Sequence, residues 1–326
     1  MLYDEDNNPK GLVISDEINK IHSRKKILIG GAIILCCIFA MVIGIGVSHK
    51  MSNKTQAAEV AQEAPVQEKK EEPKKLPSNN KEKLAVYSGE HMQIGVHSLD
   101  QIKYKFTPKY NHNAQQEITN IYYSEEKVAY LTFDDGPTKT ITPQILDILK
   151  QEQVPATFFV LGSRVELNPD ILRRTFEEGH YIANHGYSHK YSQIYTSRDT
   201  VFDEYIKCEN AIRNALGNQE YNTYLFRFPG GSSGGRYAGV KAEAKQLLNS
   251  YGVNYTNWNC LTGDAEGNTT PEAIMGCLQQ SMEGDGSIIV LMHDASDKTY
   301  TVETLPTVIA YLREQGYTFK NFYGIF

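Results

Sequence analysis

Cysteine is scarce in this sequence, and no two cysteines have the C-x-x-C spacing. The 326 residues contain five cysteines, and the three outside the longest apolar run are Cys208, Cys260 and Cys277. These three could form one disulfide, but their number and spacing argue against a zinc site made of cysteines. A basic excess is also absent, because 33 Lys and Arg stand against 39 Asp and Glu, which gives a net charge of −6. Nucleic acid is therefore not expected as a partner.

One long apolar run stands out in a sequence whose mean hydropathy, −0.44, excludes a protein with many membrane spans. Residues 27–47 are 21 consecutive residues without a charge. A helix of that length, at ~1.5 Å per residue, crosses a hydrocarbon core of about 30 Å. Arg24, Lys25 and Lys26 precede the run, so the positive-inside rule puts residues 1–26 in the cytoplasm. We expect a single-pass protein of the cell membrane whose C-terminal part is extracellular. A cleaved signal peptide is the alternative, although its apolar core is normally ~7–15 residues long.

The composition changes twice after the apolar run. Residues 48–83 are mostly Lys, Glu, Gln, Pro and Asn, and we expect them to be a disordered extracellular linker because they cannot bury enough apolar surface to fold. Apolar and aromatic residues return in 84–126, a pre-domain segment to which the sequence assigns no role. From 127 to 326, strand-like runs alternate with helical stretches, and helices are predicted to open at Asn168-Pro169 and Thr270-Pro271. The strand-like runs are 128–133, 155–161, 180–184, 223–228, 253–258, 287–292 and 317–322. This alternation predicts an α/β fold with a parallel sheet, open or closed into a barrel.

Ionisable residues lie at the ends of five of these strands, at positions that a parallel sheet brings to one edge. They are Asp134 and Asp135, His185 and His189, Arg227, Asp264, and His293. The i,i+4 spacing of His185 and His189 predicts that both imidazoles lie on one face of a helical turn, where they could bind one metal ion. Two histidines and one aspartate leave a coordination position open for water, as hydrolytic metal sites require. Because adjacent side chains at a strand end diverge, one of Asp134 and Asp135 can bind the metal while the other acts as a base.

A different mechanism is indicated by residues 230–234, GGSSG, which match the G-x-S-x-G nucleophile elbow. The chain order Ser232, Asp264, His293 is also that of the serine α/β-hydrolases. This hypothesis leaves the paired aspartates and histidines without a role, and glycine-rich loops match short patterns easily. A serine hydrolase remains open as the second hypothesis.

Residues 127–326 resemble a polysaccharide deacetylase domain, the NodB-homology domain of carbohydrate esterase family 4. Five motifs carry the resemblance in the family's order: TFDDGP (132–137), NHGYSH (184–189), RFPGG (227–231), WNCLTGDA (258–265) and LMH (291–293). The chain departs from the family pattern at Gly186, where Ser or Thr is usual, and at Gly230, where Tyr is more frequent. Leu261 and Ala265 stand where the family has Asp and Trp. These changes resemble a subgroup of Gram-positive peptidoglycan N-acetylglucosamine deacetylases.

The resemblance implies a distorted, incomplete (β/α) barrel and a metal-dependent deacetylase. One divalent ion, with zinc favoured over cobalt or manganese, would be bound by Asp135, His185 and His189. Four residues would serve in catalysis: Asp134 as the general base, His293 as the general acid, Asp264 as the partner of that acid, and Arg227 as the group that orients the base. Three would contact the substrate: Gly230 through a backbone N–H that stabilises the oxyanion, and Trp258 and Leu291 as lining of the acetyl pocket.

The sequence therefore predicts a hydrolase that removes N-acetyl groups from a cell-envelope amino sugar. N-acetylglucosamine of peptidoglycan is favoured, because the anchor and linker would hold the domain at the wall. Chitin oligomers, poly-N-acetylglucosamine and acetylxylan stay open as substrates. An inactive wall-binding module that keeps the fold is the third hypothesis. The expected partners are a cell-wall glycan and the membrane, and the oligomeric state is not predicted.

Overall fold

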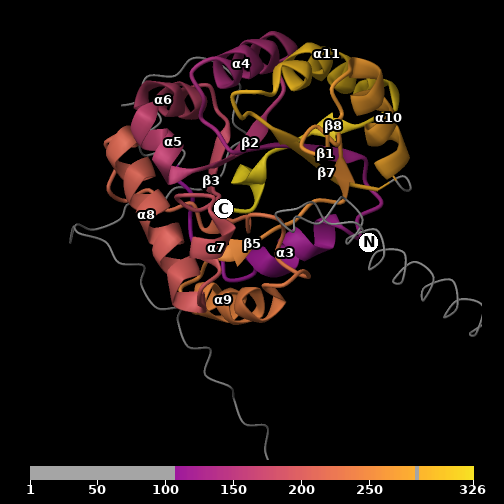
Figure 1. Cartoon of the computed structure of the whole chain (residues 1–326). Helices are drawn as coiled ribbons and strands as arrows, with labels where there is room; N and C mark the ends of the chain where they lie inside the picture. The colour runs from indigo at the N-terminus through magenta and orange to yellow at the C-terminus, as the bar shows by residue number, and fades with distance from the viewer. Residues whose placement is uncertain (1–106, 283–285) are drawn as a thin grey trace, which may run out of the picture. The chain divides into compact units, whose positions relative to one another are not determined.

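The computed structural model describes residues 107–282 and 286–326. Within them, eight strands form one parallel sheet in the order β5-β4-β3-β2-β1-β7-β6, with β8 paired to β1. No ladder joins β5 to β6 in this part of the chain, so the sheet is a parallel half-barrel, and Figure 1 shows helices such as α4, α6, α8 and α11 around its outside. The strands are β1 (Val128–Asp134), β2 (Ala156–Val160), β3 (Tyr181–Asn184), β4 (Leu225–Phe226), β5 (Asn254–Tyr255), β6 (Cys260–Leu261), β7 (Ile288–His293) and β8 (Thr318–Phe319). The predicted α/β class and parallel sheet are confirmed.

Two helices begin where the sequence predicts. In α10 the Thr270 hydroxyl accepts the N–H of Ala273, and Pro271 occupies the first turn. Helix α6 starts at Pro169, but the Asn168 side chain does not cap it. The helices are α3 (Ala114–Ile121), α4 (Ile141–Glu152), α5 (Gly162–Leu167), α6 (Pro169–Glu177), α7 (Tyr191–Ile194), α8 (Arg198–Leu216), α9 (Ala238–Ser250), α10 (Pro271–Ser281), α11 (Thr299–Glu314) and the 3-10 helix η1 (Phe322–Gly324).

Three predicted strands are shorter than expected, and one strand was not predicted. β4, β5 and β8 have two residues each, where the sequence suggests runs of six. The Arg227 N–H still donates to the carbonyl oxygen of Asn184 at 2.9 Å, but Pro229 has no N–H for a ladder and the chain turns at Pro229 and Gly230. β6 has two residues, too few for an alternating pattern to indicate a strand.

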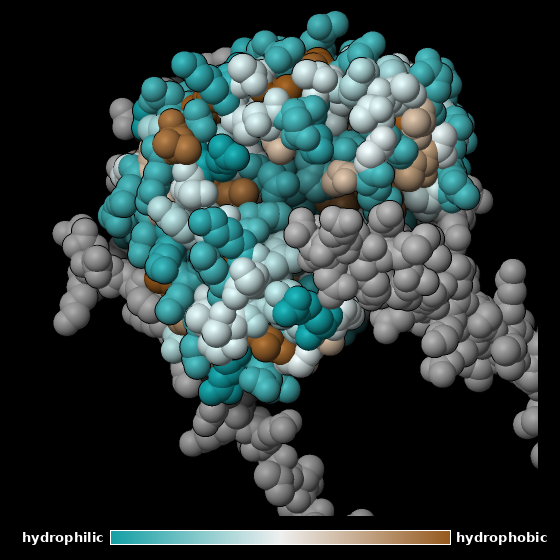
Figure 2. All heavy atoms as spheres, in the orientation of Figure 1, coloured by the Kyte–Doolittle hydropathy of each residue, from teal (hydrophilic) through white to brown (hydrophobic). Residues whose placement is uncertain are grey.

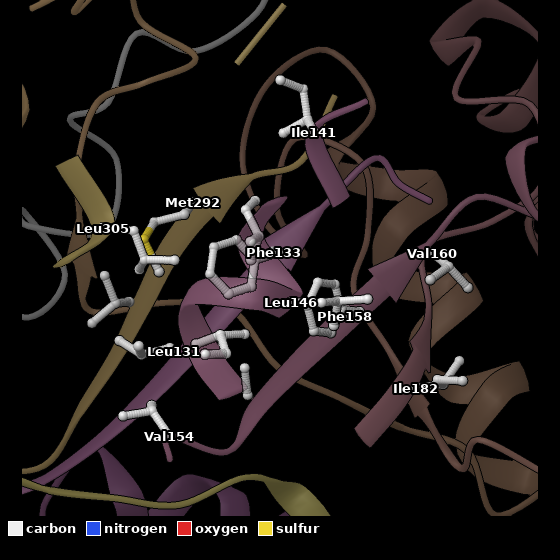
Figure 3. Packing of buried hydrophobic residues seen from close by; sticks show 14 of the residues in the cluster. Leu131, Phe133, Ile141, Leu146, Val154, Phe158, Val160, Ile182, Met292 and Leu305 are labelled. Atoms are coloured by element: carbon white, nitrogen blue, oxygen red, sulfur yellow. The ribbon is translucent and has the colours of Figure 1, made fainter. Parts of the chain in front are cut away.

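The outward face of β1 builds the larger hydrophobic core. Leu131 and Phe133 are fully buried and belong to one cluster with Leu146 of α4 and Phe158 of β2. The Phe133 and Phe158 rings stack with their centroids 5.1 Å apart. Figure 3 shows these side chains between the strands and the helix that covers them. This packing fixes the position of β1 and therefore of the residues at its end.

The inward face of β1 carries polar side chains toward the strand's end. Because side chains alternate along a strand, Tyr130, Thr132 and Asp134 share this face. Tyr130 packs on Phe322 with ring centroids 5.3 Å apart, in a second core cluster. Beyond it, the buried side chains of Thr132 and Asp134 need polar partners inside the barrel.

The segment before 127 packs against the sheet. Ile118 of α3 is fully buried in the inward core. The Gln115 side chain bonds the backbone of Tyr255 on β5 twice, donating to its carbonyl oxygen at 3.0 Å and accepting its N–H at 2.9 Å. The Tyr122 hydroxyl accepts the N–H of Asn257 at 3.0 Å. α3 thus supports the loop that follows β5.

Of the helices in the described residues, none is both long enough and apolar enough to cross a membrane. The expected cytoplasmic tail (1–26), anchor (27–47) and linker (48–83) lie outside those residues. On the face drawn in Figure 2, the coloured atoms are mainly hydrophilic and the hydrophobic ones form scattered spots.

The three cysteines of the described part are free. Cys208 is buried and donates its S–H to the carbonyl oxygen of Val160 at 3.3 Å. Cys260 is buried with its sulfur 3.4 Å from the Ser281 hydroxyl. They act as small packing groups, and no disulfide joins them in this part of the chain.

Candidate metal and catalytic centre

A buried arginine organises the interior at the end of β1. Arg227 follows β4, has no exposed surface, and donates from Nη1 to Asp134 Oδ1 at 2.8 Å and to Thr132 Oγ1 at 2.7 Å. Its Nη2 donates to the carbonyl oxygen of Asn257 at 3.1 Å. The guanidinium carbon lies 3.9 Å from the centroid of the Phe159 ring. The sequence prediction that Arg227 and Asp134 meet agrees with this geometry.

The loop after β3 brings His185 and His189 together, but not on a helical turn as predicted. Gly186 has φ of +86° and His189 has φ of +58°, so the chain coils through left-handed conformations instead of a helix. The Glu204 carboxylate of α8 holds this loop by accepting the N–H groups of Tyr187 at 2.9 Å and Ser188 at 2.7 Å. Glu204 was not predicted, because nothing in the local sequence links α8 to this loop.

Asp135, His185 and His189 place three ligand atoms within 4.8 Å of one another. The Oδ1 atom of Asp135 lies 3.7 Å from His185 Nε2 and 3.4 Å from His189 Nε2. This oxygen is buried and has no hydrogen-bond partner among the described residues, as expected of an atom reserved for a metal. One carboxylate and two imidazoles with further positions open suit a hydrolytic zinc ion, and also cobalt or manganese. The predicted ligand set therefore fits a divalent ion.

The hydrogen bond of His185 selects the tautomer that leaves Nε2 able to bind a metal ion. Its Nδ1 lies 2.7 Å from the carbonyl oxygen of Arg227, and a carbonyl can only accept, so Nδ1 carries the proton. Nε2 then presents its lone pair toward Asp135. Burial lowers the pKa of His185 to about 3, which keeps the ring neutral.

Asp134 and His293 occupy paired positions on the neighbouring strands β1 and β7. Burial raises the pKa of Asp134 above its ordinary value, although the nearby Arg227 guanidinium opposes this shift. The Asp134 carboxylate is held by Arg227 through Oδ1, while Oδ2 lies 3.7 Å from His185 Nε2. The two aspartates thus have different surroundings, as the prediction of separate roles requires.

His293 is paired with a buried carboxylate. Its Nδ1 lies 2.8 Å from Asp264 Oδ1, and its backbone N–H donates to Asp264 Oδ2 at 2.8 Å. Burial alone would disfavour the charged ring, but Asp264, with smaller contributions from Asp135 and Asp134, raises the pKa of His293 to about 9. Thr301 of α11 donates to Asp264 Oδ2 at 2.8 Å and completes the arrangement. Thr301 was not predicted, since it lies 37 residues from Asp264 in the chain.

Comparison with known proteins bears on this geometry. Residues 121–256 match the family model described as polysaccharide deacetylase. A peptidoglycan-N-acetylglucosamine deacetylase of Bacillus cereus is 35% identical over 205 residues, which cover 60% of this chain and 86% of that protein. The chain belongs to the polysaccharide deacetylase family. A Listeria monocytogenes protein of the same name is 35% identical over 193 residues, 58% of this chain but 36% of the Listeria protein. A solved Streptococcus mutans CE4 esterase superposes with a TM-score of 0.60 at 32% identity, covering 67% of this chain and 97% of that one.

In this polysaccharide deacetylase, Gly230 has φ of +69° and its carbonyl oxygen accepts from Lys241 Nζ at 3.3 Å. Its N–H has no hydrogen-bond acceptor among the described residues, so it is available to a ligand. A side chain here would meet Tyr191, whose hydroxyl oxygen would lie 2.9 Å from an added Cβ. The Tyr191 ring is also 5.4 Å from that of the ligand candidate His189. Tyr191 thus provides an aromatic wall beside the site that the sequence did not indicate.

The two other predicted substrate residues border this interior. Trp258 is half-buried with its ring 5.8 Å from the guanidinium carbon of Arg227. Leu291 of β7 is 9% exposed and lies two residues before His293. In register it pairs with Thr132 of β1, which binds Arg227. Both residues therefore lie close to the catalytic candidates.

The nucleophile-elbow pattern has a structural explanation in this family member. Ser232 is 3% exposed, and both its hydroxyl and its N–H bond the side chain of Asn257 at 2.9 Å. No hydrogen bond among the described residues joins Ser232 to His293, which is paired with Asp264. Ser232 thus ties the glycine-rich loop to the loop after β5, and the geometry gives no support to a serine nucleophile.

Asp294, directly after His293, is a buried carboxylate that the sequence did not assign. It accepts from the Thr142 hydroxyl at 2.6 Å, and burial raises its pKa to about 7. Any side chain at Gly136 would collide with it, since an added Cβ would lie 1.9 Å from Asp294 Oδ2. Glycine at position 136 therefore leaves room for the buried Asp294 carboxylate beside the end of β1.

Proposed function

We propose that this polysaccharide deacetylase removes the N-acetyl group from N-acetylglucosamine of peptidoglycan. One observation carries the proposal most directly: Asp134 and His293 lie at paired strand ends beside the Asp135, His185 and His189 cluster, each with a partner of opposite charge. Amide hydrolysis needs both a base and an acid at such a site. The identity to deacetylases named for peptidoglycan N-acetylglucosamine supports the substrate.

A divalent ion held by Asp135, His185 and His189 would polarise the acetyl carbonyl and make water a better nucleophile. Asp134 takes the proton from the attacking water, and Arg227 keeps its carboxylate oriented by a charge-assisted hydrogen bond. The free N–H of Gly230 donates to the oxygen that gains negative charge. Trp258 and Leu291 line the space for the acetyl methyl group.

The departing amine is poor as an anion and requires a proton as the C–N bond breaks. His293 is charged at neutral pH, because the Asp264 carboxylate raises its pKa to about 9 despite burial. It donates this proton to the nitrogen, and acetate and a free glucosamine amine are the products. Asp264 stays ionised throughout, since His293 lowers the pKa of that carboxyl in spite of burial.

The test is acetate release from purified peptidoglycan by the full-length protein in detergent, with zinc and with chelator. Asp134→Asn should lower the rate by about 10²- to 10⁴-fold, the range typical of removing a general base. Its zinc content should stay unchanged, because Asp134 is not among the three ligand candidates. Asp199→Asn, a change at a carboxylate that is 73% exposed, is the matched control. Turnover of acetylated chitin or xylan without release from peptidoglycan would refute the substrate and keep the mechanism.

We further propose that residues 27–47 anchor the protein in the cell membrane, with residues 1–26 in the cytoplasm and the catalytic domain outside. The support is the uncharged 21-residue run and the three basic residues before it. Protease added to intact cells should degrade the domain. In untreated cells the protein should be recovered with the membrane fraction. Recovery of a protein that lacks residues 1–47 from the medium would favour signal-peptide cleavage instead.

A further inference from the structure

A hollow of about 260 Å³ opens beside two of the metal-ligand candidates, Asp135 and His189. Another part of its wall is the short helix α5, which contributes Ser163, Arg164 and Leu167. The volume is slightly below the ~300 Å³ at which ligand-enclosing pockets usually begin. The hollow therefore suits one part of a longer chain that lies across the site.

The backbone of α5 is bound to the loop that carries the ligand histidines. The N–H of Gly162 donates to the carbonyl oxygen of Gly186 at 3.0 Å, and the N–H of Ser163 donates to that of Tyr187 at 3.1 Å. In Figure 1, α5 lies between α6 and α8 at the rim of the fold. These bonds hold the backbone at the start of α5 against the loop that carries His189, so the Arg164 side chain starts from a defined place beside it.

Arg164 brings a positive charge that nothing in the described residues neutralises. Its side chain is exposed and makes no hydrogen bond or ion pair there. The acids near it along the chain are engaged elsewhere, since Glu166 accepts from the Tyr187 hydroxyl at 2.8 Å and Asp170 pairs with Arg173. Among the described residues that line the hollow, Arg164 is the one permanent cation.

Leu167 gives the same wall an apolar surface. It is 71% exposed, the largest exposed fraction among the large hydrophobic side chains described as exposed. An exposed leucine beside an exposed arginine is suited to a ligand that has an apolar face next to an anionic group. A sugar ring with a carboxylate substituent has both features.

We propose that Arg164 binds a carboxylate of the glycan substrate and that Leu167 packs against the sugar that carries it. This inference rests on the proposed peptidoglycan function. Muramic acid, the neighbour of each N-acetylglucosamine in peptidoglycan, carries a lactyl carboxyl group that is either free or extended by a stem peptide with its own carboxylates. Chitin oligomers carry no carboxylate. Arg164 is thus a specificity residue that favours muramic-acid-containing strands over neutral glycans.

The experiment compares kcat/KM of the zinc-loaded full-length protein on three substrates: peptidoglycan fragments with stem peptides, the same fragments after an amidase has removed the stems, and chitotetraose. Arg164→Gln should lose about tenfold on one or both carboxylate-bearing substrates and stay within about twofold on chitotetraose, the effect of one charge-assisted hydrogen bond. The control Arg198→Gln, which removes another exposed arginine, should change none of them. Calorimetric binding of the same fragments to Asp134→Asn, with and without Arg164→Gln, gives a readout independent of turnover.

Each result decides the inference. A loss confined to stem-bearing fragments assigns the carboxylate to the peptide, and a loss on amidase-treated fragments assigns it to the lactyl group. An equal loss on all three substrates, or none on any, overturns the specificity role. If the wild-type protein releases acetate from no substrate, the proposed function fails, and the binding measurements then test Arg164 alone. The selective loss should shrink as salt rises from 0.05 to 0.5 M, because exposed charges are screened.

Discussion

Replacing Asp264 with asparagine tests the proposal that His293 is the acid and that Asp264 keeps it charged. Asp264 lies 2.8 Å from His293 Nδ1, and the His293 side chain is 12% exposed. The pKa of His293 is raised from 6.5 to about 9, which corresponds to ~3 kcal/mol in favour of the charged ring. Asparagine keeps the shape but removes the charge, so burial should dominate and the pKa should fall by about two units or more.

Two measurements follow this change. The alkaline limb of the pH profile of kcat/KM, near pH 9 in the wild type, should move to pH 7 or below in Asp264→Asn. NMR titration of the metal-free protein should show the same displacement for the His293 ring. Thr301→Val is the control, since it removes a hydrogen bond to Asp264 Oδ2 but keeps the carboxylate. It should move the limb by less than about half a unit.

The same pair makes stability depend on pH. A histidine whose pKa is raised on folding stabilises the protein below its unfolded pKa of 6.5, and this stabilisation is lost as the pH rises through about 9. The wild-type free energy of unfolding should therefore fall between pH 6.5 and 9 by more than that of Asp264→Asn. An alkaline limb that stays near pH 9 in Asp264→Asn would refute the assignment of His293 as the acid.

Three further predictions concern the structure around the site. Glu204→Gln, which weakens the hydrogen bonds from α8 to the loop between His185 and His189, should lower zinc affinity by about 10- to 100-fold, measured by competition with a chromogenic chelator. Glu243→Gln, on the exposed side of α9, is the control and should leave zinc affinity unchanged. Gly230→Ala should lower the free energy of unfolding by about 1–2 kcal/mol, and by more than Gly217→Ala. Both glycines have positive φ, but only at position 230 would the added Cβ also press against Tyr191. Equal losses of the two variants in urea titration would contradict this. Leu146→Ala should destabilise by about 2–5 kcal/mol with an unchanged pH profile, and a shifted profile would show that the core does more than support β1.

The sequence predicted which residues come together at the end of the sheet, because strand order and the rule for parallel sheets need only local patterns. Asp134, Arg227 and His293 each lie at the end of a recognisable strand, so their convergence did not depend on loop detail. The path between His185 and His189 could not be predicted, since an i,i+4 spacing equally suits a helix and a loop. The deciding contact comes from Glu204 of α8, which is distant along the chain. Long-range hydrogen bonds of this kind leave no periodic signal.

Asp134 and His293 lie at paired positions on β1 and β7, and each has a buried partner of opposite charge. Arg227 favours the deprotonated form of Asp134, and Asp264 favours the protonated form of His293. Burial raises the pKa of Asp134 and would by itself favour the protonated carboxyl. The buried Arg227 guanidinium opposes this shift and favours the ionised Asp134 carboxylate. Burial lowers the pKa of His293, which would leave an isolated ring neutral, but the Asp264 carboxylate more than reverses the shift. Between the raised pKa of Asp134 and a pH of about 9, the proposed base Asp134 is thus ionised while the proposed acid His293 is charged. Because both pairs are buried, removal of Arg227 or Asp264 leaves Asp134 or His293 without its charged partner, and burial then favours the neutral form of that group.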